Sequence, residues 1–411
     1  MMALKHSQIL RTASFLIAVC FVALPAQAKY SGGTGEPNDP YEIATATDLI
    51  ALGETPEDYD KHFRLVADID LDPNLPGRKV FDRAVIASDT DDATGSFQGA
   101  AFTGFFDGNN HTILHLKIQG ASYLGLFGRL GVRHSMPGIE DLGVVDVNVT
   151  GSGSFVGGLV GYCDSGTVTR CRTIGVVSGG GIVGGLVGYN RRGIVTRCHS
   201  TGAIKGKLYV GGLVGLSDGS GAVTQCHSEG VVSGNLGIGG LVGRNHGTAT
   251  QCHSAAAVSG TGDQPLGIGG LVGQNSFGDV TRCYSVGAVK GYYDVGGLVG
   301  WNGGFVTQCY STGAVINESR PVAGLVGGST GYSTADQCFW DTQTSGQAAS
   351  SGGTGKTTAE MQTAKTFLDA GWDFVGETAN GTEDIWWILE GKDYPRLWWE
   401  APGDPNATAG K

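Results

Sequence analysis

Cysteines at a regular spacing are the first residues in this sequence that could do chemistry. Eight of them follow residue 28, and seven recur in one pattern, usually after Val-Thr-Arg or Val-Thr-Gln: Cys171, Cys198, Cys226, Cys252, Cys283, Cys309 and Cys338. Repeats stacked about 4.8 Å apart would permit disulfides between neighbouring copies. Cysteine is also among the most buried residue types when it is free. Both interpretations stay open, and the burial preference favours an inert interior ladder.

Histidines directly follow three of these cysteines, at His199, His227 and His253. A column of imidazoles could approach the geometry of a metal site. The same repeat position elsewhere holds a cation and aromatic rings: Arg172, Tyr284, Tyr310 and Phe339. Because a dedicated metal ligand would not alternate with such residues, we interpret the position as a partly exposed stacking ladder. We predict neither a metal nor a cofactor.

Two further motifs are typical of a phosphate-binding loop and of a zinc protease, but each lacks an essential residue. The stretch that ends in Gly-Lys356-Thr357 has Ser350 where a phosphate loop requires its first glycine. The motif His111-Thr-Ile-Leu-His115 has the histidine spacing of a zinc protease without the catalytic glutamate. We interpret the first motif as part of a linker and the second as a strand.

Acidic residues could hold calcium or catalyse the cleavage of sugars. Asp68, Asp70 and Asp72 alternate as they do in a calcium-binding loop, but Pro73 replaces the glycine that the bend requires. The acids of the repeats do not recur at one position, so the sequence offers no acid pair for catalysis. We therefore predict that the protein is not an enzyme. The alternative is a carbohydrate-active β-helix, either a polysaccharide lyase or a hydrolase.

The elements that carry these residues must be strands and turns. Glycine accounts for 72 of 411 residues, more than double the usual share of about 7% and too many for helices. A chain that is 40% hydrophobic and 16% charged is not a disordered one. The net charge of -11 gives no basic footprint for nucleic acid or for an anionic membrane surface.

An internal repeat organises most of the chain. Gly-Gly-Leu-Val-Gly recurs at intervals of 27, 27, 28, 30 and 27 residues, and Ala323-Gly-Leu-Val-Gly follows after a further 27. The six full copies begin at Gly157, Gly184, Gly211, Gly239, Gly269 and Gly296. From each cysteine the sequence alternates, so that Cys198, Ser200, Gly202 and Ile204 lie on one face of a strand. Thr196 and Arg197 interrupt the alternation, which predicts a corner there.

The repeat pattern predicts an all-β fold. Interior residues this small suit a ribbon that is wound on itself, and each repeat would then be one coil stacked on the next. Turns with left-handed backbone are expected at four asparagines that follow the glycine-rich strand: Asn190, Asn245, Asn275 and Asn302. We predict a right-handed parallel β-helix, or β-solenoid, of about seven to eight coils with caps at both ends.

The repeated residues resemble a known family. Gly-Gly-Leu-Val-Gly, a turn with Asn, and then Val-Thr-x-Cys-x-Ser-x-Gly-x-Val are similar to the GLUG motif of bacterial secreted and surface proteins, over every copy from Gly157 to Cys338. GLUG repeats also accompany some immunoglobulin A peptidases and adhesins. The resemblance implies a β-helical surface module without established catalytic residues.

The flanking segments divide the chain further. Residues 1–28 have the composition of a signal peptide that is cleaved after Ala28, which predicts a secreted or cell-surface protein, and no later stretch is apolar enough for a membrane helix. We expect a strand-rich cap or start of the solenoid at 29–120, with a short helix at 45–52, and the repeats at 121–342. A Ser/Gly-rich linker is expected at 343–357, and a tryptophan-rich C-terminal cap at 358–411, with helical composition from Thr358 to Ala370.

The predicted function is that of an adhesion or ligand-presenting scaffold. Its partner would be an extracellular glycan or a cell-surface protein, and a glycan-binding module belongs to the alternatives. Outward aromatic rings are the expected ligand contacts: Tyr284, Tyr310, Trp386 and Trp398. For the tryptophans, burial in the core of the terminal cap is the competing interpretation.

Overall fold

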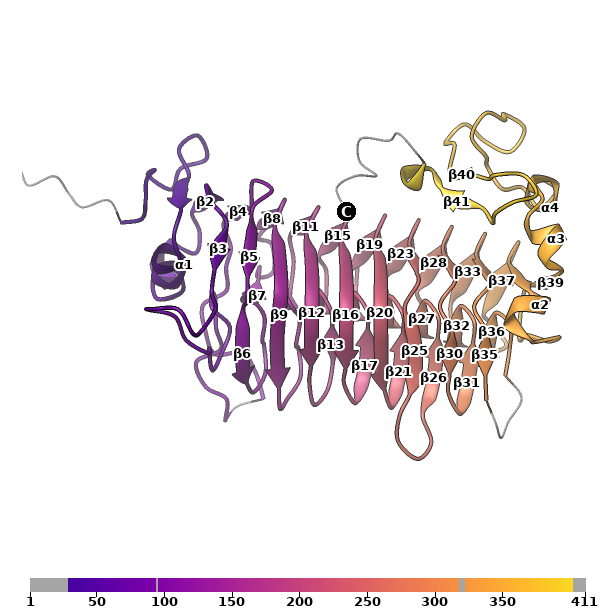
Figure 1. Ribbon diagram of the computed structural model, residues 1–411, viewed down its shortest axis with the longest axis horizontal. Helices are drawn as coiled ribbons and strands as arrows, with labels where there is room; N and C mark the ends of the chain where they lie inside the picture. Colours follow the sequence, from indigo (N-terminus) through magenta and orange to yellow (C-terminus); the bar gives the residue numbers. More distant parts are fainter. Residues whose placement is uncertain (1–28, 94, 318–321, 402–411) are drawn as a thin grey trace, which may run out of the picture.

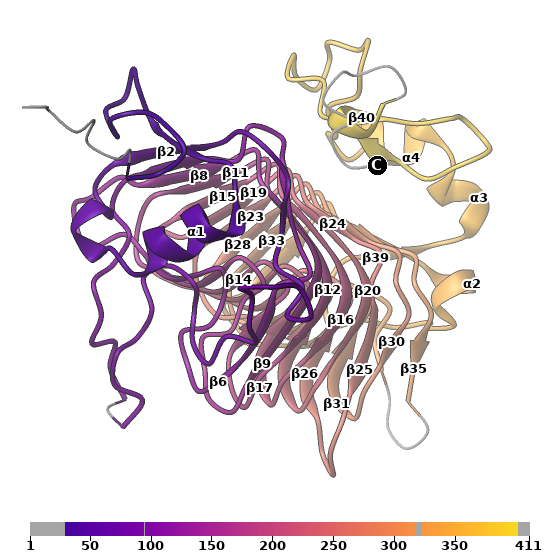
Figure 2. The ribbon, with the colours of Figure 1, turned by 60° about the vertical axis from the view of Figure 1, so that its left-hand side comes forward.

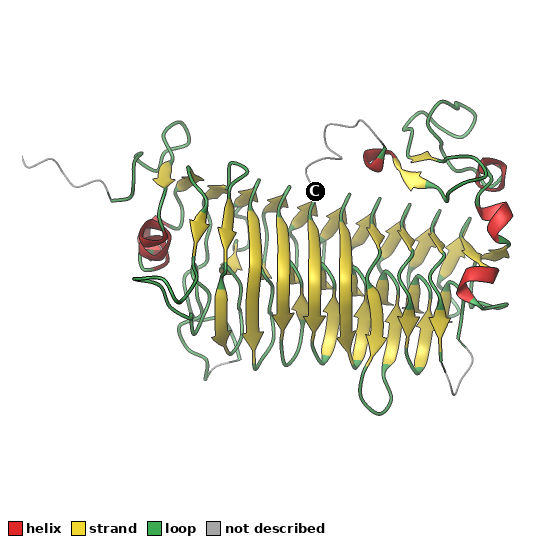
Figure 3. Cartoon of the chain, viewed as in Figure 1, coloured by secondary structure: helices red, strands yellow, loops and turns green. Residues whose placement is uncertain are grey.

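The computed structural model describes residues 29–93, 95–317 and 322–401. The chain forms a parallel β-solenoid in which each coil pairs with the one before and the one after it (Figure 1). Each regular coil passes in turn through four sheets, here called sheets I to IV, and the eight strands of sheet IV mark eight coils. This confirms the predicted parallel β-solenoid, and Figure 3 shows how few helices accompany it.

Sheet I has 11 strands in the order of the chain. They are β1 (Tyr41–Ile43), β2 (His62–Leu65), β4 (Phe105–Asp107), β8 (Gly138–Glu140), β11 (Thr167–Thr169), β15 (Ile194–Thr196), β19 (Ala222–Thr224), β23 (Thr248–Thr250), β28 (Asp279–Thr281), β33 (Phe305–Thr307) and β37 (Thr334–Asp336). The first three belong to the segment before residue 120, so the solenoid begins well before the first regular repeat.

Sheet II contains the residues that follow the cysteines. Its main path is β3 (Ile69–Asp70), β5 (Thr112–Leu114), β9 (Gly143–Gly151), β12 (Arg172–Ser178), β16 (His199–Lys205), β20 (His227–Gly234), β24 (His253–Ser254), β29 (Tyr284–Ser285), β34 (Tyr310–Ser311), β38 (Phe339–Asp341) and β39 (Thr354–Lys356). Beside it lie β6 (Lys117–Gly120), β25 (Ala257–Gly260), β30 (Val289–Lys290) and β35 (Val315–Ile316).

Sheets III and IV complete each coil around the Gly-Gly-Leu-Val-Gly motif. Sheet III is β13 (Val183–Gly184), β17 (Leu208–Gly211), β21 (Leu236–Gly239), β26 (Leu266–Gly269) and β31 (Tyr293–Gly296). Sheet IV is β7 (Phe127–Leu130), β10 (Val160–Cys163), β14 (Val187–Asn190), β18 (Val214–Ser217), β22 (Val242–Asn245), β27 (Val272–Asn275), β32 (Val299–Asn302) and β36 (Val326–Ser329). The glycines let neighbouring coils approach closely: a Cβ on Gly240 would lie 2.0 Å from the carbonyl oxygen of Gly270.

The corner of each coil lies directly before its cysteine. Arg197 has a φ of 54°, and the equivalent residue of every regular repeat is also left-handed: Arg170, Gln225, Gln251, Arg282, Gln308 and Gln337. The predicted corner at Thr196 and Arg197 is confirmed. The prediction of a left-handed turn at the asparagines is wrong, because Asn245 and Asn275 are buried residues at the ends of strands. The Nδ2 of Asn245 donates to the Oδ1 of Asn275 at 3.1 Å.

The segment at 29–120 combines a short helix with irregular coils. Helix α1 (Ala46–Gly53), the short helix expected at 45–52, begins after Thr45, whose hydroxyl accepts a hydrogen bond from the Asp48 amide. It is followed by the 3-10 turn η1 (Pro56–Asp58). The motif from His111 to His115, which we interpreted as a strand, contains β5. Strand β6 follows separately, because His115 is left-handed with a φ of 57°.

The C-terminal segment differs most from the expectation. The expected linker at 343–357 contains strand β39, which pairs with β38 and extends sheet II, and helix α2 (Thr342–Ser345) precedes that strand. The helical stretch at 358–370 is two short helices, α3 (Thr358–Met361) and α4 (Ala364–Leu368). The chain continues through β40 (Trp386–Trp387), β41 (Arg396–Leu397) and the 3-10 turn η2 (Trp398–Glu400).

Residues 357–401, called the C-terminal arm below, fold back along the outside of the solenoid. Figure 2 shows the arm beside the coils that carry β24, and not as a plug across the end of the rod. Its buried residues form a second hydrophobic cluster with Tyr284, Tyr310 and Phe339 of sheet II. Among the residues described, no helix is long and apolar enough to cross a membrane.

Candidate functional site

The residues that follow the cysteines form a continuous ladder on the outer face of sheet II. The parallel register places His199 beside His227, His253, Tyr284 and Tyr310 in successive coils. Neighbouring rings are 4.9 to 5.0 Å apart between centroids, and their planes are within 11° of one another. The predicted stacking of this column is therefore present in the structure.

The C-terminal arm covers much of this ladder. The Trp399 ring lies 5.3 Å from that of His253 and 6.0 Å from that of His227. The Tyr284 hydroxyl donates to the Glu400 Oε1 at 2.6 Å, and the Tyr310 hydroxyl donates to the carbonyl oxygen of Pro395. The arm is thus held by the same side chains that would otherwise form an open aromatic face.

The aromatic residues that the sequence suggested as ligand contacts do not form an accessible surface here. Tyr284 and Tyr310 are each 1% exposed and Trp386 is 0% exposed. Trp398 is half-buried, and its Nε1 donates to the Gln251 Oε1 at 3.2 Å. Three of the four side chains therefore lie in the interior between arm and solenoid, and the fourth is bonded to a corner residue.

Burial beneath the arm changes the proton affinities of the ladder. It lowers the pKa of His253 to about 3 and that of His227 to about 2, because a charged imidazole would lose its hydration. Burial also raises the pKa of Glu400, whose Oε1 lies 3.7 Å from the His253 Nδ1. Both histidines are therefore neutral at pH 7, and they stack as rings rather than acting as cations.

The seven repeat cysteines and Cys163 are buried and free. In the ladder, the backbone N–H of Cys198 donates to the sulfur of Cys226 at 3.4 Å, and this contact recurs from coil to coil. The Cys198 thiol lies within hydrogen-bonding distance of two carbonyl oxygens, those of Val168 and Thr196. The structure thus has the interior ladder and not the alternative of disulfides.

Burial makes the thiols of Cys163 and Cys226 poor nucleophiles. Burial raises the pKa of the Cys163 thiol to about 12 and raises that of Cys226 well above its ordinary value. Only a thiolate attacks an electrophile or binds a metal. These two thiols therefore serve packing.

The histidines and aspartates of the first coils are brought together in pairs. His111 Nδ1 lies 3.1 Å from Asp68, and His115 Nδ1 lies 2.8 Å from Asp70. The Asp70 carboxylate raises the pKa of His115 by accepting this hydrogen bond. The His115 Nε2 also lies 3.7 Å from Asp146, so this imidazole contacts carboxylates on both sides. These pairs join neighbouring coils at β3 and β5.

An acidic cluster in sheet I has ligand-like spacing. Asp107, Glu140 and Asp141 have carboxylate oxygens within 4.8 Å of one another. Arg170 pairs with both Glu140 and Asp141, and Arg64 pairs with Asp107. Because each of the three carboxylates already pairs with an arginine, the cluster is explained as an ion-pair network between coils.

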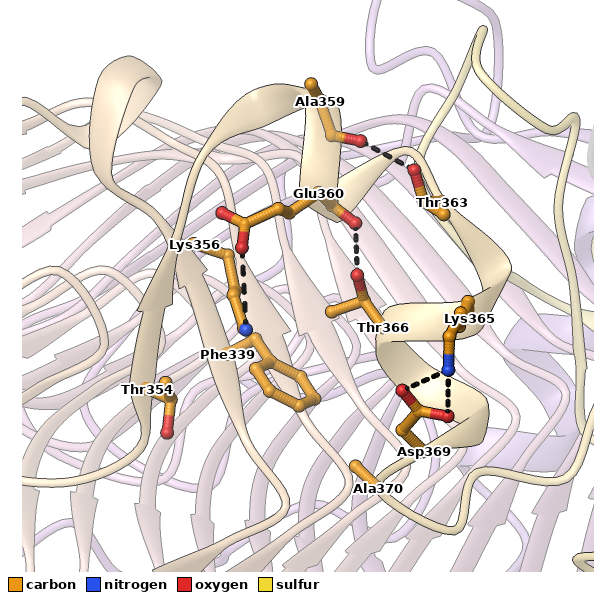
Figure 4. Close-up of a pocket in the computed structure, with 10 residues that line it drawn as sticks. All are labelled: Phe339, Thr354, Lys356, Ala359, Glu360, Thr363, Lys365, Thr366, Asp369 and Ala370. Carbon is orange, nitrogen blue, oxygen red and sulfur yellow. Dashed lines mark hydrogen bonds and ion pairs between the residues drawn. The ribbon is translucent and has the colours of Figure 1, made fainter.

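A cavity of about 630 Å³ lies between sheet II and helices α3 and α4 (Figure 4). It contains the Lys356 that suggested a phosphate loop. Lys356 Nζ lies 3.6 Å from Glu360, and Lys365 pairs with Asp369 at 2.7 Å. Strand β39 leads into a helix of only four residues. The pocket therefore holds internally paired charges and lacks the architecture of a phosphate loop.

The comparison with known sequence motifs agrees with this coil structure. The sequence model of the GLUG motif matches residues 179–205 and 265–290. The chain carries GLUG repeats. The first match runs from just before β13 to the end of β16, which is one full coil, and the second runs from just before β26 to the end of β30. A GLUG repeat is thus one turn of the solenoid.

Two relatives are similar to part of this chain. Halomucin of Haloquadratum walsbyi is 33% identical over 151 residues, which are 35% of this chain and 2% of Halomucin. A "Putative Gly-rich membrane protein" of Evansella cellulosilytica is 33% identical over 129 residues, 29% of this chain and 14% of the relative. The chain therefore spans only a small part of either protein.

A solved structure shares the fold. The crystal structure described as a "putative immunoglobulin A1 protease" from Bacteroides ovatus superposes with a TM-score of 0.51 at 17% identity. The match covers 91% of this chain and 96% of that one. At this identity the likeness concerns the β-helical fold alone.

Sequence reasoning missed a group of arginines around a buried carboxylate. Arg129, Arg191 and Arg192 all pair with Asp164. Asp164 and Arg191 are separated by one repeat period, so they lie in adjacent coils. The repeat period could have revealed the pair of Asp164 and Arg191. It does not indicate which outward-facing columns of side chains the C-terminal arm leaves uncovered.

Proposed function

We propose that this chain is a non-enzymatic, exported scaffold whose coils present side chains for adhesion to an extracellular glycan or a cell-surface protein. The observation that carries the proposal is the constant register of the coils, which turns each outward position into a column. In sheet I, for example, one outward position is threonine in six successive coils: Thr169, Thr196, Thr224, Thr250, Thr281 and Thr307. Such columns are extended contact surfaces on a rigid support.

The chemistry of the described residues supports a scaffold. The thiols are buried, the cavity beside α3 and α4 is lined by paired charges, and the carboxylates of the acidic cluster are paired with arginines. Catalysis on a polysaccharide would require a positioned acid and base next to an open binding groove. A carbohydrate-active β-helix is therefore the second candidate, and the test below includes it.

Adhesion is tested with the full chain coupled to fluorescent beads. The beads should bind to a glycan array or to cultured cells, and binding should be saturable and competed by free protein. In parallel, the polymers that are bound should be incubated with the protein and their length followed by chromatography. Unchanged polymer length supports the scaffold, whereas depolymerisation would establish the enzyme. Beads that bind neither glycans nor cells would contradict the adhesion proposal.

Export is tested separately. Cleavage after Ala28 would leave Lys29 at the mature N-terminus, and residues 1–28 lie outside the described part of the structure. The Lys29 Nζ lies 2.8 Å from Asp58, so the described fold begins at this residue. Expression of the full chain in a bacterial host should give extracytoplasmic protein that starts at Lys29 by mass spectrometry. A retained leader on cytoplasmic protein would contradict the proposal.

A further inference from the structure

Sheet IV carries a group of arginine and tyrosine side chains on the outer surface of its first coils. The register aligns Arg129 of β7 with Tyr162 of β10 and Tyr189 of β14. Arg191 and Arg192 follow directly after β14. These five residues are called the arginine–tyrosine patch below. The C-terminal arm packs on sheet II and makes no described contact with them.

The aromatic rings of the patch are fixed by their neighbours. Tyr162 and Tyr189 pack edge to face, with centroids 4.9 Å apart. The Arg129 guanidinium lies over the Tyr162 ring at 5.4 Å, and the Phe155 ring lies parallel to that of Tyr189 at 5.6 Å. Both tyrosines are partly exposed. The patch thus offers ordered rings at the surface, which can bind a ligand with little loss of side-chain entropy.

The patch has more positive than negative side chains. Three guanidinium groups converge on Asp164, which is 3% exposed: Arg129 at 3.0 Å, Arg192 at 2.5 Å and Arg191 at 3.5 Å. Asp218, which accepts a hydrogen bond from the Tyr189 hydroxyl at 2.8 Å, is a second acid at the patch. Three cations thus face two carboxylates, in a chain whose net charge is -11.

The arginine with the longest ion pair is also the most exposed. The Arg191 side chain is 46% exposed, and its contact with Asp164 is the weakest of the three. A guanidinium carries five N–H donors, and one carboxylate shared among three arginines cannot accept all of them. The Arg191 guanidinium, as the most exposed of the three, is the one best placed to offer donors to a ligand. These donors match the oxygens of a carboxylate or a sulfate in a bidentate manner.

We propose that the arginine–tyrosine patch binds an anionic saccharide. The Arg191 and Arg192 guanidinium groups bind a carboxylate or sulfate of the sugar, and the Tyr162 and Tyr189 rings contact the sugar ring beside it. This assignment rests on the proposed adhesive function, and it names the chemical class of the partner and the surface that binds it. Neutral polymers would lack the charge-assisted bonds and would bind weakly.

The experiment measures binding of the full chain to three polymers by biolayer interferometry at low salt. Polygalacturonate supplies carboxylates, dextran sulfate supplies sulfates, and dextran is the neutral control. We expect binding to at least one anionic polymer, weak binding to dextran, and a loss of affinity as salt is added. The stronger of the two anionic arms identifies the group that the arginines recognise.

Variants locate the binding surface. R191Q/R192Q should lower the affinity by about ten-fold or more, the effect of losing charge-assisted hydrogen bonds. Arg197→Gln is the matched control, since Arg197 lies on the corner before sheet II and bonds to Gln225. Tyr162→Leu should weaken binding, whereas Tyr162→Phe should keep it because the ring is retained. Thermal unfolding shows whether each variant is folded.

Several outcomes would overturn the inference. They are equal binding to dextran and the anionic polymers, an unchanged affinity in R191Q/R192Q, and an absence of binding to both anionic polymers at low salt. If R191Q/R192Q does not fold, the Tyr162→Leu and Tyr162→Phe pair decides, and equal affinities for the pair count against the patch. Beads that still adhere to cells or to neutral glycans would leave the adhesive function standing while this inference fails.

Discussion

The indole ring of Trp399 lies nearly parallel to the imidazole of His253, with centroids 5.3 Å apart and an angle of 19° between the planes. One ring belongs to the C-terminal arm and the other to the outer ladder of sheet II. The Trp399 Nε1 also donates to the carbonyl oxygen of Gln251 at 3.2 Å. This contact joins the arm to the middle of the rod.

Replacing Trp399 with alanine should loosen the arm without unfolding the coils. The variant loses the ring contacts with His227 and His253 and one hydrogen bond, together worth about 1–3 kcal/mol. Hydrogen exchange should increase in the arm and around residues 251–285, while strands β12 and β16 keep their protection from exchange. Tyr332→Ala is the control, since Tyr332 is 94% exposed. Unchanged exchange in the arm would show that Trp399 does not hold it.

Acid should weaken the docking of the arm. Folding lowers the pKa of His253 to about 3 from an unfolded value of about 6.5. Between these values the unfolded state binds a proton that the folded protein does not, so stability falls as the pH falls, by at most about 1.4 kcal/mol per pH unit. His227 contributes in the same direction.

Other groups around His253 shape this pH dependence. The raised pKa of Glu400 acts in the opposite direction, because protonation of its buried carboxyl favours the docked state on acidification. The Arg396 Nη1 lies 3.7 Å from the Glu400 Oε1, and its raised pKa keeps this guanidinium charged throughout the range. His253→Phe removes one titratable group and keeps an aromatic ring in the ladder, where Phe339 already occupies the same position in a later coil. The thermal midpoint of this variant should fall less steeply between pH 6.5 and pH 4 than that of the wild type. If the thermal midpoints of the variant and the wild type fall equally with pH, the titration of His253 does not contribute to the effect of acid.

The thiols should be inert in the native protein. Burial raises the pKa of Cys163 to about 12, and the ladder sulfurs contact backbone groups on both sides. The eight thiols of Cys163 and the ladder should therefore react with Ellman's reagent in denaturant and react very slowly without it. Non-reducing mass spectrometry of the denatured protein provides a second measurement. A mass lower by two hydrogens per bond would indicate disulfides and contradict the free ladder.

A methyl group in the glycine motif should separate two coils. In Gly240→Ala the added Cβ would meet the Gly270 carbonyl oxygen at 2.0 Å and the Ser254 hydroxyl oxygen at 2.2 Å. Because backbone atoms cannot move aside cheaply, we expect a loss of stability of about 1–3 kcal/mol, seen as a lower urea midpoint. At Gly331 an added Cβ has no neighbour within 4 Å, so Gly331→Ala should be neutral. Similar urea midpoints for both variants would mean that the backbone at Gly240 and Gly270 moves apart at little cost in stability.

The repeat period gave a reliable account of the coils because the interactions within them are themselves periodic. The alternation after Cys198 predicted its buried face, and the interruption at Thr196 predicted the corner that Arg197 makes. The asparagines were misassigned because their preference for turns is weaker than the gain from a buried amide ladder. A sequence pattern indicates that Asn275 ends a strand, but only the stacking of coils provides the amide partner that stabilises it when buried.

The sequence by itself determined the solenoid, its interior column and the spacing of its coils, since each coil repeats the same local pattern and pairs with its neighbours in register. The position of the C-terminal arm was decided only by the tertiary structure. Trp398 bonds to Gln251 across a separation of 147 residues, and no period relates the two. The tryptophans could have covered the end of the rod or its side. The outward ladder of aromatic rings favoured the side, because docking there removes the apolar surface of both partners from water.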